Sequence, residues 1–177
     1  QFLQSDISEL KLQILIIISN ITSFSERLSV STFRIVHFQY FFNIIIESIE
    51  FVHVNDIFVN IIQNSSRIIF NVFHATKKLY KDKIFPDDFI NSLFGIIKDI
   101  FTSHPNFPYI DLLFCAEEIL NSNGDYAIKF QEYDLIPHLN HAITLIESPS
   151  IQIVTLGIFN LLLKNSVQTD SIDILHV

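Results

Sequence analysis

Apolar residues recur at three- and four-residue spacing along most of the chain, which is the spacing of one face of an α-helix. The clearest examples are Leu135, Leu139, Ala142, Ile143 and Ile146 in one segment and Ile151, Val154, Ile158, Leu161 and Leu162 in the next. Alternation of apolar and polar residues, which would indicate a strand, does not continue over a useful length. The pattern therefore predicts a chain of helices averaging about a dozen residues.

Prolines and acidic residues mark where these helices begin. Pro86, Pro108, Pro137 and Pro149 each lie where a first helical turn is expected, with an Asp or Ser within three residues. Proline suits this position because the amide hydrogen that it lacks would have no partner there. Gly124, in Asn-Ser-Asn-Gly-Asp, is expected to end a helix in the left-handed conformation.

The segment from Phe33 to Val54 is rich in Ile, Val, Phe and Tyr, so its strand propensity is high. Helical spacing nevertheless continues through Phe38, Phe41, Phe42, Ile45 and Ile49, and no turn signal interrupts the segment. We therefore predict a continuous helix here.

A short apolar pattern that ends in a polar residue occurs four times. The copies are Ile14 to Asn20, Ser65 to Asn71, Leu112 to Glu118 and Val154 to Asn160. Their last residues are separated by 51, 47 and 42 positions. These intervals bracket the roughly 40 to 47 residues of helical repeats of the armadillo and HEAT type.

The stretch from Gly124 to Lys164 resembles an armadillo repeat. Three features carry the resemblance: Asp-Leu-Ile-Pro at 134–137, Ser-Pro-Ser-Ile-Gln at 148–152 and Leu-Gly-Ile-Phe-Asn at 156–160. The resemblance implies an all-α fold, a right-handed superhelical α-solenoid of about four armadillo-like repeats that forms a single segment over residues 1–177. The approximate units are 1–23, 24–78, 79–123 and 124–166, with the start of a further unit at 167–177.

In peptide-binding armadillo proteins, an Asn on each third helix pairs with the backbone of an extended peptide in a concave groove. By resemblance, Asn20, Asn71 and Asn160 occupy that position, and Glu118 replaces Asn in the third unit. An amide offers a donor and an acceptor, whereas a carboxylate only accepts and would favour a Lys or Arg of the partner. The alternative is that these Asn residues are solvated or bonded to a neighbouring segment.

Nuclear-import receptors of this family carry a Trp four residues before the Asn. Here the four positions hold Ile16, Arg67, Phe114 and Leu156, and the chain contains no Trp. A receptor for nuclear-localisation signals is therefore disfavoured. The candidate groove residues are Asn20, Arg67, Asn71, Phe114, Glu118, Leu156 and Asn160.

The composition is that of an ordered chain, with 49% hydrophobic and 17% charged residues and a mean hydropathy of +0.39. The longest apolar runs, Ile14–Ile18 and Phe41–Ile46, are shorter than a membrane-spanning helix needs, so no membrane span is expected. No signal peptide is visible, and the absence of Met suggests a portion of a longer protein. Cutting a repeat array would expose an apolar end face.

The net charge of −8 disfavours nucleic acid and favours basic partners. The single cysteine, Cys115, excludes a disulfide within the chain and favours an intracellular location, with the cytoplasm as the default and the nucleus open. It aligns with Gly157 and is interpreted as a buried packing residue. The Lys77–Lys83 cluster is interpreted as a helix C-terminus, and partner or phosphate contact is its alternative.

Chemistry-bearing constellations are sparse. Asp134, His138 and His141 could share a helix face with metal-ligand spacing, but polar side chains are expected in any case near the first turn of a surface helix. Adjacent acidic pairs such as Glu117 and Glu118 point apart on a helix and cannot act as acid and base partners. We therefore expect no enzyme, no cofactor and no metal site.

The expected function is a non-enzymatic scaffold that holds a partner protein or peptide along the third-helix face. The alternative is an architectural or regulatory arm of a larger protein or complex.

Overall fold

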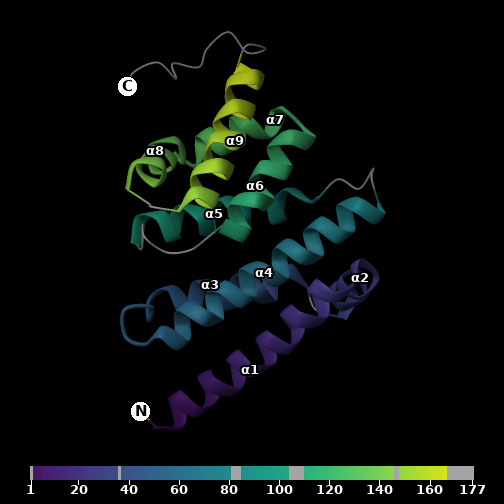
Figure 1. Cartoon of the computed structure of the whole chain (residues 1–177), viewed down its shortest axis with the longest axis vertical. Coiled ribbons are helices and arrows are strands. Elements are labelled where there is room, and N and C mark those ends of the chain that lie inside the picture. The colour runs from purple at the N-terminus through teal and green to yellow at the C-terminus, as the bar shows by residue number, and fades with distance from the viewer. Residues whose placement is uncertain (1, 36, 81–84, 104–109, 146–147, 167–177) are drawn as a thin grey trace.

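The protein is all-α in the residues that the computed structural model describes, which are 2–35, 37–80, 85–103, 110–145 and 148–166 (Figure 1). The helices of these residues are α1 (Phe2–Phe24), α2 (Glu26–Ile35), α3 (Phe38–Ile49), α4 (Asp56–Leu79), α5 (Asp87–Ser103), α6 (Ile110–Ser122), α7 (Asp125–Glu132), α8 (Ile136–Leu145) and α9 (Pro149–Ser166). The helical spacing read from the sequence is thus confirmed.

Four helices form one layer, in which each packs on the next (Figure 1). These helices, α1, α4, α6 and α9, contain the four copies of the repeated pattern, and we call them the ladder. A second layer, the outer row, consists of α3, α5 and α8, which pack on α4, α6 and α9 respectively. Within this row, α5 contacts both α3 and α8. Segments about 45 residues apart in the sequence therefore lie side by side.

Two of the three connections between ladder helices carry an additional helix among the described residues. Helix α2 packs against both α1 and α4, and α7 packs against both α6 and α9. The order of a bridging helix, an outer-row helix and a ladder helix thus occurs as α2–α3–α4 and again as α7–α8–α9.

The core lies between the two layers and continues through both halves of the described chain. At the α3–α4–α5 junction, five rings cluster: Phe38, Phe42, Phe73, Phe85 and Phe89. In the C-terminal half, Phe130 of α7 meets Phe94 of α5 edge to face at 5.1 Å. Aromatic rings bury large apolar areas, so these contacts hold the two layers together.

Proline placement predicted the helix starts well. Helix α5 begins directly after Pro86, α9 begins at Pro149, and Pro137 lies in the first turn of α8. Pro108 lies outside the described residues.

The continuous helix predicted over Phe33–Val54 is wrong. The described chain breaks at His37, whose backbone is extended (φ −73°, ψ 149°), and α3 begins at Phe38. A turn follows over residues 50–54. No Gly or Pro marks this break in the sequence. Packing explains the break, since α2 contacts α1 and α4 whereas α3 contacts α4 and α5. The helical spacing from Phe38 to Ile49 is confirmed, since all five predicted core residues are buried.

The prediction of a left-handed Gly124 is also wrong. Gly124 has right-handed angles (φ −60°, ψ −28°) and precedes α7 directly. The side chain of Asn123 performs the capping, because its Oδ1 accepts the amide of Asp125 at 3.0 Å. The left-handed residue of this region is Asp134 (φ 54°), at the turn before α8.

Candidate interaction face

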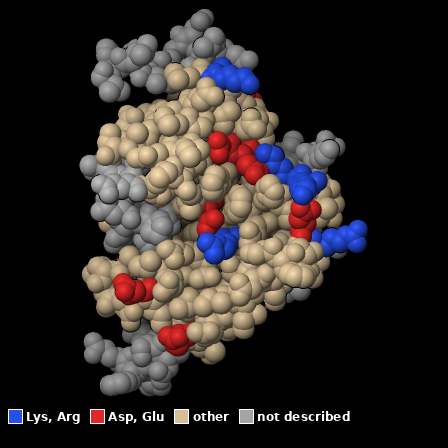
Figure 2. Space-filling view, viewed as in Figure 1, with Lys and Arg blue, Asp and Glu red and all other residues tan. Residues whose placement is uncertain are grey.

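The ladder presents one open side, which is the side seen in Figures 1 and 2. On this side acidic and basic side chains lie next to one another over α4, α6 and α2, while most of the remaining surface is uncharged (Figure 2). We call this side the ladder face. The seven residues predicted from the sequence to line a groove lie on the four ladder helices, and the structure gives them different roles.

Asn71 and Glu118 link neighbouring helices. The amide nitrogen of Asn71 on α4 donates to the hydroxyls of Ser23 (2.9 Å) and Thr22 (3.2 Å) at the end of α1. Glu118 on α6 lies 2.8 Å from Nδ1 of His74 on α4 through Oε1. Its second oxygen lies 3.6 Å from Nζ of Lys77, which also donates to the Glu118 carbonyl oxygen. The Lys or Arg partner expected for Glu118 is therefore present within the chain itself.

These two links have the same geometry. Ser23 lies three residues after Asn20, and His74 lies three residues after Asn71. In both cases the residue at the candidate groove position contacts the preceding ladder helix three residues beyond that helix's own groove position. The alternative interpretation of Asn71, bonding to a neighbouring segment, describes it better than a free groove amide.

Arg67 and Phe114 lie on neighbouring helices of the face. Arg67 is largely exposed and its Nε lies 3.8 Å from a carboxylate oxygen of Asp111 on α6. Phe114 packs on Phe70 of α4 with ring centroids 5.8 Å apart, and Phe70 stacks on the ring of His74. The centre of the face is therefore aromatic, with a flanking cation.

Asn20, Leu156 and Asn160 are exposed. Leu156 is 56% exposed on α9. These three residues, with Arg67 and Phe114, form the part of the predicted set that remains accessible to a partner.

Sequence reasoning missed a polar hollow at the junction of α1, α2 and α4. It has a volume of about 400 Å³ and is lined mainly by small hydroxyl groups together with Glu26, Asn71 and His74. The only signal was the run Thr-Ser-Phe-Ser-Glu at 22–26, which was not recognised because its members come together with α4 only in the fold.

Two carboxylates of α6, Asp111 and Glu117, are partly buried, which disfavours their ionised forms. Burial raises the pKa of Asp111, and the nearby Arg67 partly opposes this rise. Burial and then the neighbouring Glu118 raise the pKa of Glu117. Glu117 is directed at Gly157 of α9, where a Cβ would lie only 2.0 Å from its Oε1. Glu117 and Glu118 thus face different helices, as predicted for adjacent residues.

Glu117→Gln is expected to stabilise the protein near neutral pH. The pKa of Glu117 in the folded state lies above its ordinary value of 4.5. Ionisation of Glu117 therefore lowers the free energy of unfolding, and this loss is complete once the pH exceeds the folded-state pKa. The advantage of the variant should fall away as the pH decreases through this pKa and should vanish below pH 4.5. Urea unfolding near neutral pH and below pH 4.5 measures the difference in stability between the variant and the wild type. The control is Glu132→Gln, because Glu132 is exposed. An equal gain at both pH values would contradict the assignment to charge burial.

The candidates for chemistry find little support in geometry. Cys115 is completely buried, and burial is the main cause that raises the pKa of its thiol well above its usual range. This matches the interpretation as a packing residue. His138 stacks on Phe101 with the rings 11° from parallel, and the side chain of His141 lies outside the described residues. Among the described side chains, no group of three or more His, Cys, Asp or Glu is arranged to hold a metal ion.

Lys77 and Lys78 lie in the last turn of α4, as predicted for a helix C-terminus. Lys77 bonds to Glu118 of α6, and Lys78 pairs with Glu26 of α2. Residues 81–83 of the cluster lie outside the described residues.

Comparison with known proteins does not identify the chain: no family model, curated protein or solved structure matches it.

Proposed function

We propose that this chain is a non-enzymatic, armadillo-like solenoid segment that holds a segment of a partner protein along the ladder face. The observation that carries the proposal is the twofold occurrence of one arrangement, in which a bridging helix joins consecutive ladder helices and an outer-row helix covers the second of them. An extended array of this kind offers a long open surface, which is how helical repeat proteins bind other proteins.

The repeated polar link between ladder helices supports the same proposal. Asn71–Ser23 and Glu118–His74 connect residues 48 and 44 positions apart, with matching register. A repeat would generate this regularity, since each unit would dock on the preceding one in the same way. In the proposed array, α2–α4 and α7–α9 are two units, and α5–α6 is a unit that shows only its outer-row and ladder helices among the described residues.

The accessible residues indicate how a partner would bind. Phe114 and Leu156 supply apolar contacts, Arg67 supplies a cation, and Asn20 and Asn160 each offer a donor and an acceptor to a peptide backbone. Asn71 and Glu118 serve the helix–helix contacts and are left out of the contact set. Basic partners remain favoured by the net charge of −8, whereas the face itself pairs its charges (Figure 2). An intracellular location accords with the single buried thiol.

The second candidate is an architectural or regulatory arm of a larger assembly. The observation that favours it is the uncovered apolar side of α1, on which six large apolar residues are exposed.

Site-specific photo-crosslinking tests the proposed binding face. A photoreactive side chain at Leu156, Asn20 or Asn160 should give adducts with the same partner in cells that contain the protein. The matched control is Asp99, an exposed residue on α5 in the outer row. Adducts of equal yield from Asp99, or none from the three ladder positions, would contradict the proposal.

A further inference from the structure

Helix α1 has a large apolar side that is largely exposed in the described structure. The six residues on this side are Ile7, Leu10, Ile14, Ile17, Ile21 and Phe24, and they are between 41% and 87% exposed. On its other side α1 packs on α4, with Leu12 and Leu15 buried. We call the six exposed residues the α1 stripe. Because water contact with so many large apolar groups is unfavourable, the stripe requires a partner.

The spacing within the stripe indicates what kind of partner fits. Its members follow one another at intervals of three, four, three, four and three residues. This is the 3.5-residue period of a heptad seam, with Ile7, Ile14 and Ile21 at one core position and Leu10, Ile17 and Phe24 at the other. Such a narrow, regular seam is typical of contact with another helix.

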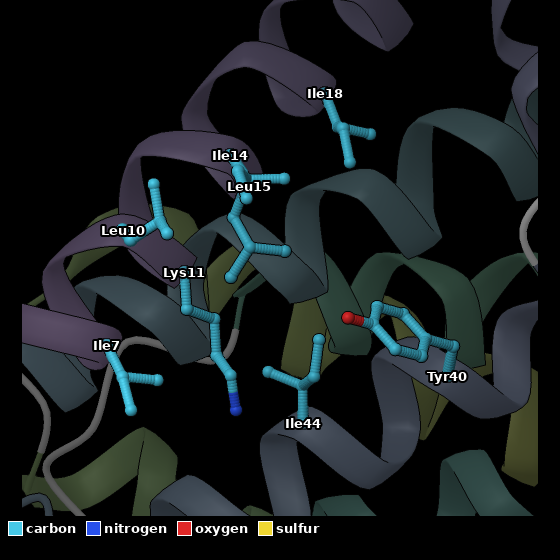
Figure 3. A pocket seen from close by; sticks show the side chains of 8 residues that line it. All are labelled: Ile7, Leu10, Lys11, Ile14, Leu15, Ile18, Tyr40 and Ile44. Atoms are coloured by element: carbon cyan, nitrogen blue, oxygen red, sulfur yellow. The ribbon is translucent and has the colours of Figure 1, made fainter. Parts of the chain in front are cut away.

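A groove beside the stripe can receive the side chains of an opposing helix (Figure 3). It measures about 440 Å³ and lies between α1 and α3, with Ile7, Ile14, Tyr40 and Ile44 among its walls. The hydroxyl of Tyr40 points toward α1 in Figure 3. Lys11 is the one charged residue of the lining, and it is paired with Glu47 of α3 at 3.5 Å. The groove is thus mainly apolar, and the charge of Lys11 is paired with that of Glu47.

We propose that the α1 stripe is the interface of a homodimer, in which α1 of one copy packs against α1 of a second copy. The stripe carries no charge, so two identical surfaces meet without repulsion. Gln13 flanks the stripe, and an amide can pair with the amide of a second copy because it both donates and accepts. A dimer of this kind would also continue the ladder, since α1 would contact a helix on each side.

A lipid surface fits the same stripe less well. The segment Ile7–Phe24 is long and apolar enough to cross a membrane, with a mean hydropathy of 1.3, by a criterion that core helices also meet. Helices that bind membrane surfaces usually carry several Lys or Arg on their polar side. In Ile7–Phe24 the charged residues are Glu9 and Lys11 alone, and the whole chain carries −8, which anionic lipids would repel.

Sedimentation equilibrium of the 177-residue chain over a wide concentration range tests the dimer. The wild-type protein should reach twice its mass of 20.5 kDa. Ile17→Lys places a charge in the seam of both copies and should raise the dimer dissociation constant by about a hundredfold or more, with circular dichroism unchanged. The matched control is Ile153→Lys, since Ile153 is 70% exposed on α9, away from the stripe, and this variant should remain dimeric.

Engineered cysteines give an independent readout, because Cys115 is buried and should not react. Ile14→Cys should form an intermolecular disulfide with itself in a parallel pair, or with Ile17→Cys of a second variant in an antiparallel pair. A wild-type monomer at all concentrations, equal dissociation by Ile153→Lys, or flotation of a monomer with neutral or anionic vesicles would overturn the proposal.

Discussion

Phe73→Ala is expected to lower the free energy of unfolding by about 3 to 5 kcal/mol, the range typical of removing a large buried ring. Phe73 is 1% exposed on α4 and lies 4.4 Å from the ring of Phe85 and 5.7 Å from that of Phe89. Those rings contact Phe38 of α3 in turn, at 6.4 and 4.6 Å. The substitution therefore opens a cavity at the point where α3, α4 and α5 meet.

Urea unfolding followed by circular dichroism measures this effect. The control is Phe51→Ala, because Phe51 is 41% exposed in the turn after α3 and its ring lies 5.3 Å from that of Phe58, outside the five-ring cluster. It should cost about 1 kcal/mol or less. Equal losses for the two variants would show that the five-ring cluster does not form as described.

Phe130→Ala should have the second-largest effect, about 3 to 4 kcal/mol, although α7 has only eight residues. Phe130 is completely buried, and its ring meets Phe94 edge to face and belongs to the contact between α7 and the rest of the C-terminal half. Removal of the ring leaves α7 with few buried apolar groups, since Ala127 is the other residue of this helix that is fully buried.

Ile128→Ala on the same helix serves as the control, because Ile128 is 48% exposed. Its expected cost is below about 1 kcal/mol. A Phe130→Ala loss that does not exceed this value would mean that α7 is held by other contacts, such as the bond between Lys129 and Asp87 at 2.7 Å.

Much of the fold could be predicted from local signals. The apolar spacing located the helices, and the prolines located the starts of α5, α8 and α9, because both depend on residues adjacent in the chain. The break at His37 and the right-handed Gly124 could not be predicted in this way. In both places the backbone conformation depends on which distant helices a segment contacts or on which neighbouring side chain caps it.

For the candidate site too, the sequence indicated local features but not the contacts between distant residues. The four copies of the short apolar pattern lie in the four ladder helices, and Asn20, Arg67, Phe114, Leu156 and Asn160 lie at accessible positions on these helices. The sequence could not show that Asn71 bonds to Ser23 or that Glu118 meets His74 and Lys77, because these partners lie 41 to 48 residues away. The α1 stripe has a clear local signal in its 3.5-residue spacing, yet its exposure is a property of the fold.

Hydrogen exchange of Phe130→Ala and Phe73→Ala tests most directly whether the chain behaves as a stack of units. In a helical repeat array each unit is stabilised mainly by its neighbours, so damage spreads unevenly. Phe130→Ala should lose amide protection in α7, α8 and α9 while α1 and α3 retain theirs, and Phe73→Ala should show the opposite preference. Uniform loss of protection along the whole chain in both variants would contradict the stacked arrangement and indicate one cooperative globular domain.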